Sequence, residues 1–255
     1  MKKWLSMSFV FSLVLSLSLV SPVSSVSAKA VTASVLTAEN GSEVVLDKVE
    51  VYKDANGYDR VSIKGTRPTN GEPQKYHITV NRQTGTYKTT LEGLSAADTR
   101  EINASQQNTE NSQLATSYWT AWVKGTVTDP QPINASLASL QVDLTWGING
   151  SIVSFSSNNL TTWAAKPSSL GTNWFTKKSH KSAPSYRYSG NDAVKVVQEG
   201  SAEFYNYDFL DNNKITEASV WIQITGNNNK TYTYNHDTGF RGEASLLLDL
   251  DIVTN

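Results

Sequence analysis

Cysteine is absent from the 255-residue chain. Without thiols the protein has no disulfides, no thiolate metal site and no cysteine nucleophile. An excess of either charge is absent too, because 22 basic and 23 acidic residues give a net charge of −1. Nucleic-acid-binding chains gather lysine and arginine, so we expect no nucleic-acid partner. Stability must come from an ordinary hydrophobic core.

Catalytic and metal-binding motifs are also absent. The sequence contains no GxSxG element, and its three histidines, His77, His180 and His236, are too far apart to form a spaced metal motif. The stretch from Asp208 to Glu217 is rich in oxygen ligands but lacks the glycine and the ligand spacing of an EF-hand. We therefore expect no cofactor and no metal.

The first 28 residues have the order of a secretory signal peptide. Lys2 and Lys3 precede an apolar run that serines interrupt, and the small residues Val26-Ser27-Ala28 follow. We expect export, with cleavage near Ala28, and no transmembrane segment in the mature chain. The lysine-led leader and the lack of cysteine resemble Gram-positive bacterial secretion products.

The rest of the chain alternates apolar and polar residues with a period of two. Residues 118–128 and 140–146 show this pattern, as do 44–52, 76–80 and 244–252, and no stretch sustains a helical period. This pattern predicts an all-β fold, most simply an antiparallel β-sandwich.

A polar stretch at 104–117 predicts a linker between two units. All tryptophans and phenylalanines after the leader lie beyond it, so we expect a small β-rich N-terminal unit at 29–103 and a β-sandwich domain at 118–255, each with its own core. The YHITVN and TGTY segments are similar to a hairpin of secreted propeptide modules. That resemblance implies that the N-terminal unit is a propeptide, whereas its length of about 70 residues equally allows a small unit that folds by itself.

A hairpin at 217–236 is the most strongly patterned part of the chain. Val220, Ile222 and Ile224 alternate with Trp221 and Gln223, and the GNNN sequence at 226–229 predicts a four-residue turn. This turn would place Trp221 opposite Tyr234, Gln223 opposite Tyr232 and Ser219 opposite His236, all on one face. Flat rings beside hydrogen-bonding groups are typical of sugar-binding surfaces. The candidate ligand-binding residues are Trp221, Gln223, Tyr232, Tyr234 and His236, although burial of the rings under a second layer is the commoner arrangement.

Three functions remain open from the sequence. The first is a non-catalytic extracellular or cell-surface module that binds a glycan, a cell-wall polymer or a protein partner. The second is a secreted hydrolase that uses His236 or a carboxylate pair, either Glu203 with Glu217 or Asp249 with Asp251. The third is a β-pore-forming toxin, for which the alternating stretch 151–165 would supply the membrane hairpin. We expect the first, with no catalytic residues.

Overall fold

The computed structural model describes residues 31–37, 43–81, 84, 86–94, 116–129, 135–165, 173–207 and 215–255. The predicted leader and most of the predicted linker lie outside these residues. The described elements are fourteen strands and one short 3₁₀ helix: β1 (Val31–Thr37), β2 (Glu43–Lys53), β3 (Asp59–Pro68), β4 (Gln74–Asn81), β5 (Thr86–Glu92), β6 (Ser117–Asp129), β7 (Ala135–Asn149), β8 (Ile152–Ala164), β9 (Trp174–Lys181), β10 (Ser185–Ser189), β11 (Asp192–Tyr207), β12 (Ile215–Asn227), β13 (Thr231–Arg241), η1 (Glu243–Leu247) and β14 (Asp249–Thr254).

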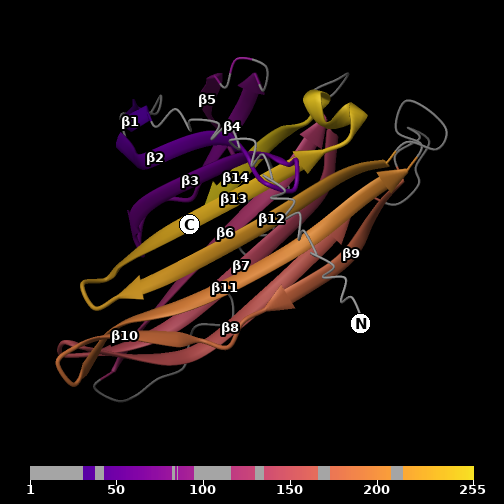
Figure 1. The fold of residues 1–255 in the computed structure, drawn as a ribbon. Coiled ribbons are helices and arrows are strands. Elements are labelled where there is room, and N and C mark those ends of the chain that lie inside the picture. The colour runs from indigo at the N-terminus through magenta and orange to yellow at the C-terminus, as the bar shows by residue number, and fades with distance from the viewer. Residues whose placement is uncertain are drawn as a thin grey trace, which may run out of the picture.

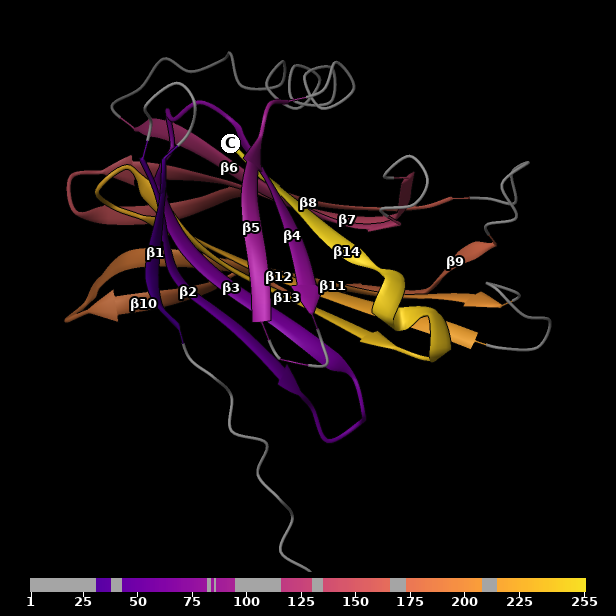
Figure 2. The same ribbon diagram turned by 90° about the horizontal axis from the view of Figure 1, so that it is seen from above.

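The strands form two antiparallel sheets that pack face to face (Figures 1 and 2). Sheet A has the order β1-β2-β3-β13-β12-β11-β10, and β9 also pairs with β11. Sheet B has the order β5-β4-β14-β6-β7-β8. The predicted all-β, sandwich-like fold is confirmed. Among the described residues, no helix has the length and apolarity needed to cross a membrane.

Alternation along each strand builds the core between the sheets. In β12, Val220, Ile222 and Ile224 are at most 1 % exposed, while Trp221 and Gln223 on the other face are half-buried. Strand β12 of sheet A packs against β6 and β7 of sheet B, and β11 packs against β7 and β8. The prediction of an inward apolar face on β12 is therefore confirmed.

Strands on both sides of the predicted linker share one core. β3 pairs with β13, and β4 pairs with β14, so residues before 95 extend both sheets. Val61, Ile63 and Ile78 belong to the same buried cluster as Ile222 and Leu250. The prediction of two separate cores is wrong, because the tyrosine-and-aliphatic composition of the early strands complements the aromatic residues of the later ones.

The end of the chain differs from its predicted single strand. Gly242, with φ 105°, turns the chain into η1, and the strand begins only at Asp249. Leu246 and Leu247 consequently lie on the surface, 52 % and 46 % exposed. Only a glycine adopts such a backbone angle readily. The turn at Gly242 therefore interrupts the strand, although the leucine-rich sequence that follows still alternates with a period of two.

Candidate functional site

The hairpin of β12 and β13 has a different register from the predicted one. Trp221 pairs with Asp237, and Ile222 pairs with His236. Gly226 stays in the strand opposite Tyr232, and the turn is Asn228 to Lys230, with Lys230 at φ 63°. The pairing is displaced by three residues from the prediction, and an odd displacement moves every β13 side chain to the opposite face.

The shift places Tyr232, Tyr234 and His236 in the core, at 0 to 1 % exposure. The predicted surface that combined them with Trp221 and Gln223 is therefore wrong. The prediction assigned Gly226 to the turn, but this glycine lies in the strand, where its lack of a side chain allows the sheets to pack closely. A Cβ on this glycine would lie 2.5 Å from the Trp146 ring of sheet B.

Tyr232 and Tyr234 belong to a buried polar cluster. The Tyr232 hydroxyl donates to the backbone carbonyl of Asn255, and Arg67 Nη1 donates to the Tyr76 hydroxyl at 3.0 Å. Burial raises the pKa of both Tyr232 and Tyr234, so each keeps its proton at neutral pH. These rings are not available to an external ligand.

His236 lies between the two sheets against β6. A Cβ on Gly125 would lie 2.1 Å from the His236 Nε2 atom, so only glycine fits opposite the ring. Within the described residues its Nδ1 atom has no hydrogen-bond partner, and burial lowers its pKa to about 3. Asp237, the next residue, points to the outer face, so the two do not form a catalytic pair.

Trp221 and Gln223 do lie on the outer face of sheet A. Gln223 Nε2 donates to Glu199 Oε1 at 2.6 Å, and Asn235 Nδ2 donates to Gln223 Oε1 at 2.7 Å. This row of three side chains crosses three adjacent strands and fixes the position of Gln223. Trp221 lies one row further along β12, where the surface is concave.

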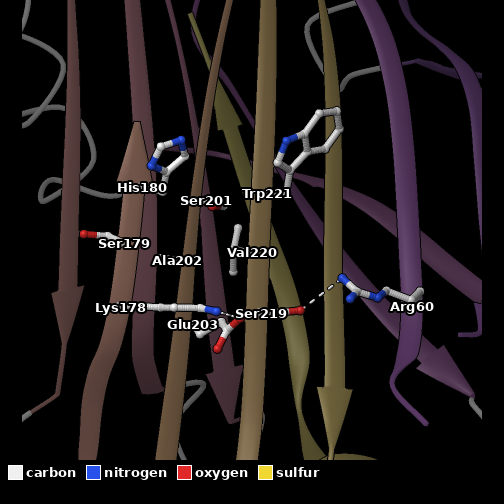
Figure 3. A pocket seen from close by; sticks show the side chains of 10 residues that line it. All are labelled: Arg60, Lys178, Ser179, His180, Ser201, Ala202, Glu203, Ser219, Val220 and Trp221. Carbon is white, nitrogen blue, oxygen red and sulfur yellow. Dashed lines mark hydrogen bonds and ion pairs between the residues drawn. The ribbon is translucent and has the colours of Figure 1, made fainter. Parts of the chain in front are cut away.

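Figure 3 shows the concave part, which we call the Trp221 hollow. It has a volume of about 200 Å³ and lies over β9, β11 and β12, with Arg60 reaching in from β3. Ser201 pairs with Trp221 on one side and with His180 on the other, so a small side chain separates two rings (Figure 3). The absence of bulk at Ser201 creates the depression.

Arg60 forms one wall of the hollow. Gly239 lies between Ser219 and Arg60 in the sheet, and a Cβ there would be 2.9 Å from Arg60 Nε. Arg60 therefore lies across the glycine, donating from Nη1 to Ser219 Oγ at 3.0 Å and to Asp237 Oδ1 at 2.7 Å. Its Nε donates to Asp54 Oδ2 at 2.8 Å.

The protonation states of this wall follow from those contacts. Burial alone would lower the pKa of Arg60, but its hydrogen bonds with Asp54 and Asp237 outweigh burial and raise it. Burial also opposes ionisation of Asp54, yet Arg60 and two backbone amides keep its pKa below the usual range. Burial and the Asp237 carboxylate raise the pKa of Tyr52, which donates to Asp237, to about 12.

Glu203 and Lys178 form the opposite wall. Glu203 pairs with Ser219 and Lys178 across the sheet, and Lys178 Nζ lies 2.8 Å from Glu203 Oε1. Lys177 Nζ lies 3.9 Å from the same carboxylate and 3.4 Å from Glu217 Oε1. Figure 3 shows Lys178, Glu203, Ser219 and Arg60 as a line of polar groups beside the two rings.

A second aromatic platform lies further along the same face. Phe175 and Tyr205 stack with their ring centroids 5.4 Å apart, and Tyr205 pairs with Glu217. Glu217 is four residues from Trp221, which corresponds to about 13 Å along a strand. Burial would raise the pKa of Glu217, but hydrogen bonds from Arg241 outweigh it and lower the pKa. This carboxyl group therefore lacks the raised pKa that the acid of a glycosidase pair requires.

A charged cluster on the outer face of sheet B was not predicted from the sequence. His77 Nδ1 lies 2.6 Å from Asp251 Oδ1, and Lys75 Nζ lies 3.0 Å from Asp251 Oδ2. Asp249 Oδ2 lies 3.5 Å from His77 Nε2. Alternation placed His77 on an outer face, but only the pairing of β4 with β14 brings it to the two aspartates. Among the described residues, no group of three or more acidic or histidine side chains is arranged to hold a metal ion.

The Trp221 hollow is the best candidate site, since it combines a half-buried indole with fixed donors and acceptors on an outer face. Comparisons with models of protein families, with curated proteins and with solved structures found no match.

Proposed function

We propose that this protein is a non-catalytic extracellular module that binds carbohydrate through the Trp221 hollow. The observation that carries the proposal is the position of the Trp221 indole, half-buried at the rim of a concave surface whose walls are hydrogen-bonding side chains. A sugar ring presents an apolar face that stacks on an aromatic ring and hydroxyls that accept and donate hydrogen bonds at its edge.

The Arg60 wall of the hollow is ordered before a ligand arrives. Arg60 is held by two carboxylates and a serine, whereas Glu203 forms a surface ion pair with the exposed Lys178. Binding then costs little side-chain entropy, which favours affinity in a small site. The hollow is below the roughly 300–1,000 Å³ of drug-sized pockets, so a single sugar ring matches its size.

Export supports an extracellular role. The leader at 1–28 predicts secretion, and an exported protein meets cell-surface and matrix polysaccharides. A protein partner is the competing ligand class. It would need a larger contact surface, of roughly 800 Å² on this chain, than the hollow alone supplies.

The test is a glycan array and a polysaccharide pull-down with the purified mature protein, comparing wild type with Trp221→Ala. The matched control is Trp163→Ala, because Trp163 is 48 % exposed on β8 of the other sheet. We expect wild type and the Trp163 variant to bind the same glycan, and the Trp221 variant to lose at least about tenfold in affinity. Absence of glycan binding by wild type, or equal binding by all three proteins, would contradict the proposal.

A further inference from the structure

The charged groups around the Trp221 hollow neutralise one another. Arg60 lies 2.8 Å from Asp54 Oδ2 and 2.7 Å from Asp237 Oδ1. On the other wall, Lys178 lies 2.8 Å from Glu203 Oε1, and Lys177 lies 3.9 Å from Glu203 Oε2. Lys177 also lies 3.4 Å from Glu217, which pairs in turn with Arg241. Four cations thus face four carboxylates, and the charges around the hollow balance.

An anionic sugar would have to compete with these carboxylates. A uronate, sulfate or phosphate group gains most from an arginine or lysine whose charge is unmatched. Here Arg60 already contacts two carboxylates, and its side chain is only 20 % exposed. Bringing a third anion to the Arg60 wall would add repulsion from Asp54 and Asp237, so the arrangement disfavours a charged ligand.

The same groups retain capacity for hydroxyls. The contacts of Arg60 with Asp54, Asp237 and Ser219 use Nε and Nη1, and a guanidinium has five N–H donors. A carboxylate has about four lone-pair sites, so Glu203 can accept from a ligand hydroxyl while it remains paired with Lys178. Vicinal sugar hydroxyls both donate and accept, which matches a surface of paired charges better than a single charge does.

We propose that the hollow takes an uncharged pyranose ring of a neutral polysaccharide, and that Phe175 and Tyr205 contact a further ring of the same chain. This inference rests on the proposed function, because it assigns the ligand class of the same site. The spacing of about 13 Å between the two platforms along the strands exceeds one sugar ring, so an oligomer is needed to contact both. Neither contact depends on net charge, so binding should be insensitive to salt.

The test is calorimetric titration of the mature protein with neutral hexasaccharides (cellohexaose, mannohexaose, xylohexaose and chitohexaose) and with oligogalacturonate. We expect at least one neutral oligomer to bind, with a Kd that changes less than about twofold between 50 and 500 mM NaCl. Its monosaccharide should bind at least about tenfold more weakly, and oligogalacturonate should not bind.

The variant Glu203→Gln makes the inference sharper, because it leaves Lys178 without its nearest carboxylate. We expect it to gain salt-sensitive binding of oligogalacturonate, whereas Glu92→Gln, which alters a lysine pair on sheet B, should not.

The outcomes separate the two proposals. Binding of oligogalacturonate alone by wild type, abolished by Trp221→Ala, would overturn the neutral-ligand inference and keep the carbohydrate function. A Kd for the neutral oligomer that weakens about tenfold or more with salt would also overturn the inference. Absence of binding to every probe and on the glycan array would overturn both.

Discussion

Polar side chains have different surroundings on the two faces of the β12–β13 hairpin. On the inner face His236 is fully buried, and within the described residues its Nδ1 atom has no partner. On the outer face Arg60 donates a charge-assisted hydrogen bond of 2.7 Å to Asp237, the cross-strand neighbour of Trp221. A buried unpaired group lowers stability, whereas an ordered and partly exposed set can bind a ligand. The comparison teaches that inner changes should alter folding and outer changes should alter binding.

The largest expected effect is a loss of folding stability in acid, caused by the buried His236 on the inner face. Burial holds the pKa of His236 at about 3, against 6.5 for the free ring. Above pH 6.5 the ring is neutral in both the folded and the unfolded chain, so its protonation does not reduce the free energy of unfolding. As the pH falls below 6.5, His236 becomes protonated in the unfolded chain, whereas in the folded chain it stays neutral until about pH 3. The free energy of unfolding should therefore fall, by up to about 5 kcal/mol over the whole range.

Urea unfolding at several pH values would check this prediction. We recommend the interval from pH 6.5 to 4.5, because Asp54 and Glu217, whose pKa values are lowered, lose their contributions mainly at more acidic pH. Burial raises the pKa of Asp143 and of Asp237, so these two groups change stability with the opposite sign, and the difference between wild type and a His236 variant isolates the histidine. The variant His236→Leu should flatten the curve, and the exposed-site variant His180→Leu should keep it. Equal pH dependence in the His236 variant and wild type would contradict the assigned burial of this ring.

The inner face also shows where sequence reasoning ends. Alternation in β12 correctly predicted that Val220 and Ile222 point inward and Trp221 outward, because the period of two is a local property of a strand. The face of the sheet to which Tyr232 and His236 were assigned depended on the assumed length of the turn. Neither residue type is apolar enough to reveal its face by itself, so the register error went uncorrected.

The outer site was only partly predictable for a different reason. Trp221 was identified, but Arg60, Glu203 and Lys178 come from β3, β11 and β9. Their convergence requires β3 beside β13 and β9 beside β11, and hydrophobic period does not specify the order of strands in a sheet. The cluster of His77 with Asp251 was missed for the same reason. A sequence pattern therefore identifies faces more readily than neighbours.

Gly125→Ala should lower stability less than the full acid effect does. The added methyl carbon would lie 2.1 Å from His236 Nε2 in the core, and overpacking of this kind costs about 1–3 kcal/mol or more. Chemical denaturation should show this loss, while Gly93→Ala, where nothing lies within 4 Å, should change stability by less than about 0.5 kcal/mol. The double variant with His236→Ala should lose less than the sum of the single variants, because the smaller side chain makes room. Strict additivity would contradict the contact.

Arg60→Met should have a smaller effect on folding and a larger one on binding. The substitution leaves Asp54 and Asp237 facing each other without their shared cation, which should lower stability by about 1–2 kcal/mol at neutral pH. The loss should shrink in acid as the carboxylates protonate. Arg60→Lys keeps the charge but lacks the planar fork that reaches both carboxylates, so it should restore only part of the stability. A neutral effect on both stability and glycan affinity would exclude Arg60 as an ordered wall of the hollow.

Trp221→Ala should affect folding least of all, although it should affect binding most. The Trp221 ring lies on the outer face and is half-buried, so its removal opens no cavity between the sheets, and the expected loss is about 1 kcal/mol. Trp146 provides the contrast, since its indole is 0 % exposed and packs against Gly226; Trp146→Ala should cost about 3–5 kcal/mol. Urea unfolding of both variants, beside the glycan titration of Trp221→Ala, measures the two properties separately. A loss of stability at Trp221 as large as that at Trp146 would mean that the ring supports the fold, and a weakened titration would then no longer identify a binding residue.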